Sequence, residues 1–180
     1  MGIYINNINW LLGIQIKCDQ QQCTISLSQK HYVEAIIKRY GFKDLLATKM
    51  PVVPGNRLTL LDGPQNNDEK ELMKGVPYMN MVGALRYATD CTRPDIAFTI
   101  SMLARFLANP GIKHMDMVQH CFQYLKGTSD YWLELGGPGT LRLAGFSDAD
   151  GSTMDGSKAI SRSVLDLGNQ PLTGNQRDKP

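Results

Sequence analysis

The sequence predicts an α+β fold, and three observations lead to this prediction. Apolar and polar residues alternate with the period of a β-strand between residues 10 and 27. The period changes to that of an α-helix between residues 29 and 40, and again between residues 76 and 127. Short strand-like runs return after residue 131. Strands at both ends of the chain, with helices between them, define the class.

Composition limits the classes of protein that the chain can be. Its 180 residues, 42% of them hydrophobic, suffice for one domain or two small pieces around a core. The net charge of +2 gives no strong field toward nucleic acid or an anionic membrane. The four cysteines lack the spacing of a zinc site, so we expect free thiols in a reducing compartment. No apolar run approaches the roughly 20 residues of a membrane span. We therefore expect an intracellular chain, cytoplasmic or nuclear, with no membrane partner.

The first element is a predicted β-hairpin. Leu12, Ile14 and Ile16 fall on one face of the first strand, and after the polar run DQQQ the same alternation returns at Ile25 and Leu27. A helix follows. Its apolar stripe includes Tyr32, Val33, Ile36, Ile37 and Tyr40, with Ser28 as the expected N-cap and Gly41 as a left-handed stop.

The middle of the chain divides into a linker and a helical segment. Residues 43–75 carry three prolines and a polar cluster, and we expect them to cross the surface without regular structure. Helical spacing returns in residues 76–130, where Thr92, Pro94 and Asp95 have the pattern of a helix start and Gly127 that of a helix end. Strand patterns follow in residues 131–168. The remaining residues, 169–180, have little to bury and should form a loose tail.

The order of several motifs carries a resemblance that no single motif would carry. LLGIQIKCDQQQCTISLSQKHYVEAIIKRYGF, PYMNMVGALRYATDCTRPDIAFTISMLARFLANPG, HCFQYLKGT and LAGFSDAD follow one another at the spacing found in the copia-type retrotransposon Pol polyprotein. Over roughly residues 10–168, the sequence resembles the end of the reverse transcriptase, the connecting helices and the opening of the RNase H domain.

This resemblance implies a domain organisation. Residues 1–42 would form the reverse transcriptase C-terminal hairpin and a thumb-like helix, followed by the linker 43–75 and the helical connection 76–130. Residues 131–168 would be a truncated RNase H-like start with an incomplete mixed sheet. In this family the polymerase needs a Tyr-x-Asp-Asp turn for its two Mg²⁺ ions, which by family order lies upstream of Trp10. We therefore expect no polymerisation by this chain alone.

The resemblance assigns a nucleic-acid-binding role to the first hairpin, as a primer grip. The residues concerned are Trp10, Leu11, Leu12 and Gly13, with Lys17 further along the strand. The role is physically reasonable because Trp10 offers a stacking face, Gly13 allows a backbone to approach closely, and Lys17 can meet a phosphate. The alternative is a hairpin packed on a helix, with Trp10 and Leu12 in the core. On the thumb-like helix, Lys30, Lys38 and Arg39 could likewise touch phosphates, or simply form a solvated face.

The acidic stretch FSDADGSTMDGS has three interpretations. A calcium-binding EF-hand loop is excluded, because it needs glycine at its sixth position and glutamate at its twelfth. Counted from Asp148, these positions are Thr153 and Ala159. A turn without ligand is the second interpretation. The third, implied by the resemblance, is the first RNase H strand, where Asp148 would be a catalytic ligand of Mg²⁺ and Asp150 could assist. Few later carboxylates complete the set, so we expect weak Mg²⁺ binding and no ribonuclease activity.

Three smaller signals have structural explanations. His114, His120 and Cys121 could suggest a metal, but the adjacent positions of the last two point in different directions from a helix, which disfavours one. Arg93 suits either a helix start or a nucleic-acid contact. Lys126 suits the last turn of a helix, where a cation is favourable.

The resemblance therefore implies a function in RNA-directed DNA synthesis. We expect a fragment of a retrotransposon reverse transcriptase and RNase H polyprotein that contributes binding of the RNA/DNA primer-template and is inactive alone. Two alternatives remain: a non-catalytic remnant that binds nucleic acid or protein, and a decayed reading frame without function. No feature of the sequence indicates a small-molecule substrate.

Overall fold

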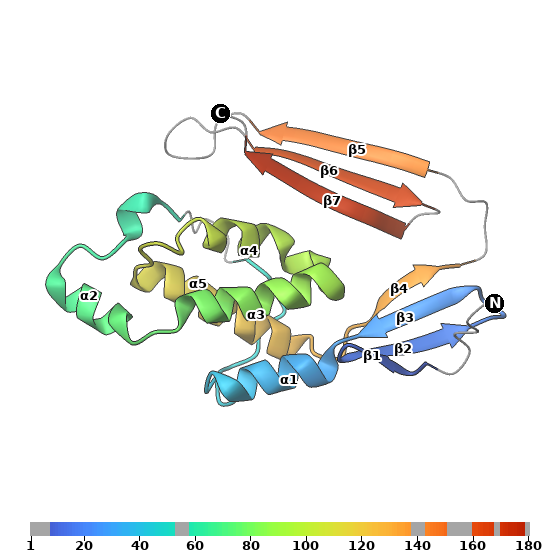
Figure 1. The fold of residues 1–180 in the computed structure, drawn as a ribbon, viewed down its shortest axis with the longest axis horizontal. Helices are drawn as coiled ribbons and strands as arrows, with labels where there is room; N and C mark the ends of the chain where they lie inside the picture. Colours follow the sequence, from blue (N-terminus) through green and yellow to red (C-terminus); the bar gives the residue numbers. More distant parts are fainter. Residues whose placement is uncertain (1–7, 53–57, 138–142, 151–159, 168–169, 179–180) are drawn as a thin grey trace. The chain divides into compact units, whose positions relative to one another are not determined.

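The computed structural model describes residues 8–52, 58–137, 143–150, 160–167 and 170–178 (Figure 1). The chain divides into two compact units: Met1–Ile16 with Leu27–Leu133, and Lys17–Ser26 with Glu134–Pro180. The described residues combine five α-helices with β-strands in two sheets, which confirms the α+β class. Each helix in these ranges is too short or too polar to cross a membrane.

The first sheet contains the predicted hairpin. Its strands are β1 (Trp10–Leu11), β2 (Ile14–Asp19), β3 (Thr24–Ser28) and β4 (Leu133–Gly136), in the order β1-β2-β3-β4. The β2–β3 hairpin follows the prediction, and the Asp19 carboxylate accepts hydrogen bonds from the Gln21 and Gln22 N–H groups of its turn. Leu12 is not in the strand as predicted, because Leu12 and Gly13 form a tight turn between β1 and β2.

Helix α1 (Lys30–Arg39) follows β3 directly. Its N-cap is Gln29, one residue after the expected Ser28, but the Gln29 side chain makes no capping bond. The buried Ser28 hydroxyl at the end of β3 accepts a hydrogen bond from the Lys30 N–H at 3.3 Å. The predicted stop is confirmed, since Gly41 has φ +75° and the Phe42 N–H donates to the Ile37 carbonyl in a Schellman arrangement. The predicted apolar stripe faces the core.

The segment expected to be an irregular linker contains two helical elements. These are the 3₁₀ helix η1 (Leu60–Asp62) and α2 (Asn67–Lys74). Helix α2 begins at Asn66, whose side chain accepts a hydrogen bond from the Glu69 N–H at 2.8 Å. Because α2 buries none of its residues, its sequence has no apolar periodicity to reveal it.

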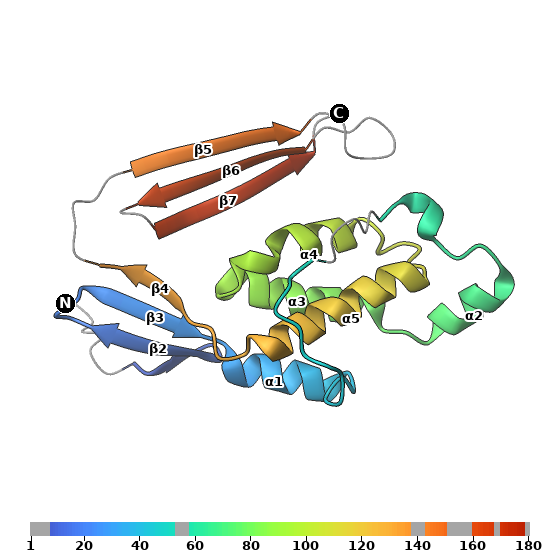
Figure 2. The same ribbon diagram turned by 180° about the vertical axis from the view of Figure 1, so that it is seen from behind.

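The predicted helical segment consists of α3 (Tyr78–Cys91), η2 (Pro94–Ile96), α4 (Ala97–Ala104) and α5 (Ile112–Gly127). Helices α3, α4 and α5 contact one another, and α1 contacts α3 and α5 (Figures 1 and 2). The core between them includes completely buried aliphatic side chains: Leu85, Ile96, Ile100, Leu103, Val118 and Leu125. Burial of this apolar surface supplies the main stabilisation of the first unit.

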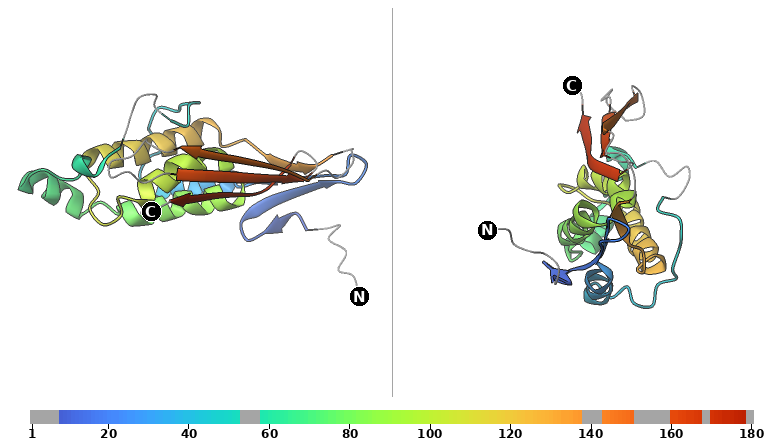
Figure 3. Two further views of the ribbon diagram at one scale, coloured as in Figure 1. Left: turned by 90° about the horizontal axis from the view of Figure 1, so that it is seen from above. Right: turned by 90° about the vertical axis from the view of Figure 1, so that its right-hand side faces the viewer.

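The second sheet consists of β5 (Leu143–Asp150), β6 (Ile160–Leu167) and β7 (Gln170–Asp178) (Figures 1 and 3). Its order is β5-β6-β7, and both strand pairs are antiparallel rather than mixed. Strand β7 occupies the segment that we expected to be a loose tail. The expectation considered only side-chain burial, whereas pairing with β6 satisfies backbone hydrogen-bonding groups regardless of side chain.

Candidate nucleic-acid interface

The first hairpin places four of the sequence-predicted binding residues together at the surface. We call Trp10–Gly13 the hairpin tip. Leu11 pairs with Ile14 across the turn, so the tip projects from the end of the β1–β2 ladder. Trp10, Leu11 and Leu12 are 48%, 53% and 81% exposed. The alternative that placed Leu12 in the core is therefore wrong, and three adjacent large apolar side chains face solvent.

The tip has an unusual backbone conformation. Leu12 and Gly13 have φ values of +50° and +80°, the pattern of a type I′ hairpin turn. Glycine adopts this region freely, whereas a leucine there is strained. A Cβ placed on Gly13 would meet no atom within 4 Å. The backbone at Gly13 is thus open to close approach by another molecule.

Side chains from two helices anchor the tip. The Tyr87 hydroxyl of α3 donates to the Leu12 carbonyl at 2.7 Å, and the Trp10 ring lies 5.1 Å from the His31 ring of α1. Tyr87 also packs edge-on against Tyr32, with 4.9 Å between ring centroids. The Tyr87 hydroxyl is protonated at neutral pH, and partial burial together with the nearby Cys91 raises its pKa further.

The predicted basic residues lie at different places. Lys17 is exposed in β2 and belongs to the second unit, whereas the tip residues belong to the first unit. Lys30, Lys38 and Arg39 are all exposed on α1. Because Lys30 is adjacent to His31, which touches Trp10, the start of α1 lies beside the tip.

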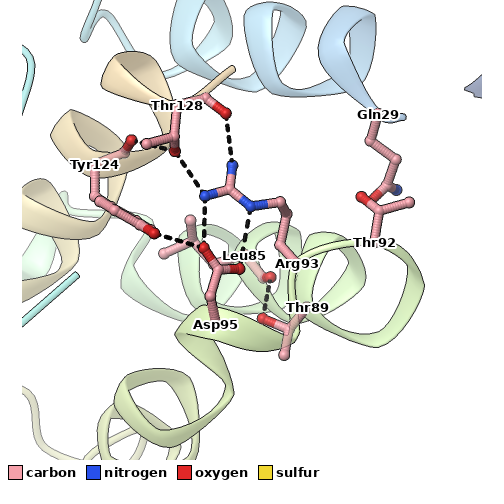
Figure 4. Close-up of polar contacts among 8 residues, drawn as sticks. All are labelled: Gln29, Leu85, Thr89, Thr92, Arg93, Asp95, Tyr124 and Thr128. Carbon is pink, nitrogen blue, oxygen red and sulfur yellow. Dashed lines mark hydrogen bonds and ion pairs between the residues drawn. The ribbon is translucent and has the colours of Figure 1, made fainter. Parts of the chain in front are cut away.

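Arg93 is not available for the nucleic-acid contact that the sequence left open. Its side chain is only 5% exposed and forms paired hydrogen bonds with the Asp95 carboxylate, at 3.1 and 2.8 Å (Figure 4). The same guanidinium donates to the Thr128 carbonyl at 3.2 Å and to its hydroxyl at 2.6 Å. Asp95 also accepts a hydrogen bond from Tyr124 at 2.7 Å. The motifs TRPDI and YLKGT thus meet in one buried polar network.

The charges of this network are mutually stabilised. Burial raises the pKa of Asp95, but the hydrogen bonds from Arg93 and Tyr124 outweigh it, and the net pKa is lowered. The Arg93 guanidinium also lies over the rings of Tyr124 and Tyr131, at 5.2 and 5.6 Å from their centroids. Sequence reasoning missed this network because arginine is rarely buried and nothing local marks its partners.

His114, His120 and Cys121 have separate surroundings. The N–H of Gly111 donates to His114 Nδ1 at 2.9 Å, while His114 Nε2 lies 3.2 Å from the Thr59 carbonyl. His120 Nε2 lies 2.8 Å from the Met50 carbonyl. Cys121 is buried in the apolar core. Within the described ranges, no three potential metal-ligating side chains form a group.

Lys126 binds carbonyl groups rather than a ligand. It lies in the last turn of α5, as predicted, and its Nζ donates to the carbonyls of Lys43 and Leu45 at 2.6 and 2.7 Å. This fixes the segment after α1 to the end of α5.

The two predicted metal-binding carboxylates lie in β5. In the register, Asp148 pairs with Arg162 and Asp150 with Ile160 of β6. Asp166 pairs with Ala144, four residues from Asp148 along the strand. The side chains of Asp148 and Asp150, and the whole of Asp155, lie outside what the structure describes.

Comparisons with known proteins identify the relatives of the chain. It is 36% identical, over 140 residues and 78% of its length, to the retrovirus-related Pol polyprotein from transposon TNT 1-94 of Nicotiana tabacum. It is 28% identical, over 167 residues and 92% of its length, to the retrovirus-related Pol polyprotein from transposon RE1 of Arabidopsis thaliana. The chain is homologous to part of the retrotransposon Pol polyproteins. The resemblance inferred from its motifs is confirmed at this level.

This Pol homologue corresponds to a small part of those proteins, since it spans 10% and 11% of their lengths. A third relative is the secreted RxLR effector protein 161 of Plasmopara viticola, 41% identical over 78 residues, which are 43% of this chain and 55% of that protein. No family model matches the chain. No solved structure matches it either.

Proposed function

We propose that the chain acts within a copia-type Pol polyprotein, where it contributes binding of the RNA/DNA primer-template to reverse transcription. The observation that carries this proposal is the hairpin tip, which exposes Trp10, Leu11 and Leu12 next to an open glycine backbone. Homology to Pol polyproteins supports a setting in which a nucleic acid is the ligand. Such a role would be exercised inside the cell, in the cytoplasm or the nucleus.

The chemistry of the tip suits the end of a nucleic-acid strand. An exposed indole can stack on a base irrespective of its identity, and the leucines can pack against sugar and base edges. The space over Gly13 allows a sugar-phosphate backbone to approach the turn. We propose that Trp10 supplies most of the contact energy and that Gly13 supplies the access.

Basic residues would supply the phosphate contacts. Helix α1, the proposed thumb-like element, carries the exposed cations Lys30, Lys38 and Arg39 and starts beside the tip. Lys17 is the proposed cation of the hairpin itself. Phosphate contacts of this kind carry no sequence information, so we expect binding that depends on salt and tolerates many sequences.

The second sheet is the proposed start of an RNase H-like domain, in which Asp148 would be the catalytic carboxylate. Mg²⁺ prefers several hard oxygen ligands and dehydrates reluctantly. In the described register, the residues opposite Asp148 and Asp150 are an arginine and an isoleucine, which add no carboxylate. These residues do not suffice to hold two Mg²⁺ ions, and we assign the chain a role in binding rather than in cleavage.

Fluorescence anisotropy with a labelled RNA/DNA primer-template tests the proposal. We expect Trp10→Ala to weaken binding about ten-fold or more, since stacking of one base contributes about 1–3 kcal/mol. Leu12→Ala should weaken it less, and Leu46→Ala is its matched control, because Leu46 is also more than 80% exposed but lies outside the tip. Affinity should fall as salt rises.

Three outcomes would contradict the proposal. The first is absence of binding by the unmodified chain at low salt. The second is equal loss of affinity in Leu12→Ala and Leu46→Ala, which would indicate nonspecific contact. The third is sustained Mg²⁺-dependent cleavage of the hybrid that Asp148→Asn abolishes, which would make the chain a nuclease. Selective binding of a protein instead of nucleic acid would favour the remnant that binds a partner.

A further inference from the structure

The turn at the hairpin tip adopts a conformation that its own sequence disfavours. A two-residue type I′ turn prefers Asn-Gly, because both residues need positive φ. Here the first position is Leu12, with φ +50° and a side chain 81% exposed. Its exposed side chain gains little from packing, so a contact to the backbone must help to hold this residue in the left-handed region.

Among the described residues, the hydroxyl of Tyr87 contacts this backbone from another element, helix α3. It donates to the Leu12 carbonyl at 2.7 Å, across 75 residues of sequence. The Tyr87 ring is itself fixed, because it packs edge-on against Tyr32. Tyr32 in turn donates a hydrogen bond from its hydroxyl to the Ala84 carbonyl of α3 at 3.0 Å. The hydroxyl that holds the turn is therefore fixed relative to both α1 and α3.

We propose that Tyr87 is a positioning residue for nucleic-acid binding: it holds the strained turn so that Trp10, Leu11 and Leu12 keep one arrangement toward the ligand. Tyr87 acts through the backbone of Leu12 and does not itself touch the ligand. The inference rests on the proposed function of the tip, and it adds a residue in the helical segment, 75 positions away, to the binding machinery.

The first test measures the turn without any nucleic acid. Tyr87→Phe removes the hydroxyl and keeps the ring pair. We expect amide hydrogen exchange at Ile14, which pairs with Leu11 across the turn, to become about five-fold faster, the factor that one net hydrogen bond corresponds to. Tyr78→Phe is the matched control: it loses a tyrosine-to-carbonyl bond from the same helix α3, to Leu103 at 3.0 Å, which plays no part in holding the turn, and it should leave Ile14 exchange unchanged.

The second test links the turn to binding through a double-mutant cycle. Leu12→Asn introduces the residue that type I′ turns prefer, so the turn should hold without help. In the unmodified background, Tyr87→Phe should weaken primer-template binding about five-fold. In the Leu12→Asn background, the same change should have almost no effect, because the hydroxyl is no longer needed. A purely structural role of Tyr87 would give equal losses in both backgrounds.

The outcomes separate the two proposals. Unchanged Ile14 exchange in Tyr87→Phe overturns the inference, as does faster exchange with unchanged affinity, or additivity in the cycle. If the unmodified chain does not bind the primer-template at all, the proposed function fails and the inference fails with it. That case is recognised because every variant then gives the same flat titration, whatever its exchange rate.

Discussion

Arg93 shows how a single residue joins distant parts of the first unit. Its guanidinium connects the start of η2, through Asp95, to the end of α5, through Thr128. A planar fork can satisfy these acceptors at the same time, whereas a lysine ammonium is a point charge with a different geometry. The shape of the side chain should therefore matter here as much as its charge.

We expect Arg93→Lys to lower the free energy of unfolding by about 2 kcal/mol, because hydrogen bonds to charged groups contribute about 1.5–3 kcal/mol each and the lysine cannot keep them all. The same substitution at Arg86 is the matched control, since the Arg86–Asp90 pair is 61% and 58% exposed. Exposed pairs contribute about 0–1 kcal/mol. Urea unfolding measures the free energy of unfolding of both variants, and an equal decrease in the two would contradict a special role for Arg93.

At the scale of elements, α5 organises the chain that passes over it. In addition to the Lys126 hydrogen bonds described above, the Gln123 carbonyl of α5 accepts a hydrogen bond from the Thr48 N–H at 3.2 Å. Gly127 makes this approach possible, because a Cβ there would lie 2.2 Å from the Thr48 carbonyl oxygen. The glycine that looked like a helix stop in the sequence also provides a packing surface.

We expect two glycine-to-alanine substitutions to have opposite effects. Gly127→Ala should destabilise the protein by about 1–3 kcal/mol, as overpacking does, because backbone must move. Gly83→Ala should stabilise it by about 0.5–1 kcal/mol, since Gly83 is exposed within α3 and a Cβ there meets nothing within 4 Å. Thermal and urea unfolding measure both. A gain in stability at Gly127 would show that Thr48 does not pack against it.

The other end of α5 contains a pH-dependent contact. His114 accepts the Gly111 N–H at Nδ1, so it is the neutral tautomer that donates from Nε2 to the Thr59 carbonyl. The ring is buried and stacks on Phe106 with 4.0 Å between centroids. Burial lowers the pKa of His114, and the nearby Lys113 lowers it further. The Thr59 carbonyl and Asp62 act in the opposite direction, but the net pKa is lowered.

We expect stability to fall as pH drops below about 6.5, the value for an unfolded histidine. Because the pKa of folded His114 is lower, the unfolded chain binds the proton first, and the loss continues until the folded pKa is reached. The free energy of unfolding should fall by at most about 1.4 kcal/mol per pH unit from this one group. His114→Gln should remove this part of the pH dependence while preserving the helix cap, since glutamine is a usual residue at this position of a capping box.

His120→Gln is the control for this experiment, because His120 is only half-buried and binds the Met50 carbonyl without capping a helix. Urea unfolding from pH 7.5 to 5 compares the three proteins. If His114→Gln and the unmodified chain lose stability in parallel over this range, the pH dependence arises elsewhere.

The sequence predicted elements where side-chain periodicity or glycine chemistry specified them, and missed those held by other means. Tyr32, Ile36 and the stop at Gly41 define α1 in the sequence and in the structure. Helix α2 depends on a cap at Asn66 and on exposed residues, which give no apolar pattern. Of the candidate site, the tip residues were predicted, but Tyr87 was not, because its contact with Leu12 is set by tertiary packing.

At the scale of the whole molecule, the first unit has one continuous core built from α1, α3, α4 and α5. Within it, α3 and α5 each contact the other three helices. Cys121 lies completely buried at its centre, and burial raises the pKa of its thiol to about 12. Cys18 and Cys23, in the second unit, are exposed.

This difference makes the cysteines reporters of cooperativity. We expect Cys18 and Cys23 to react rapidly with a thiol reagent in the absence of denaturant, and Cys121 to react only at the urea concentration where the helical circular dichroism signal is lost. Mass spectrometry of peptides after brief labelling separates the sites, and Cys121→Ser tests the assignment. Labelling of Cys121 well before the loss of helix would mean that α5 detaches on its own, because a thiol at the centre of a shared core can become accessible only when the surrounding helices separate.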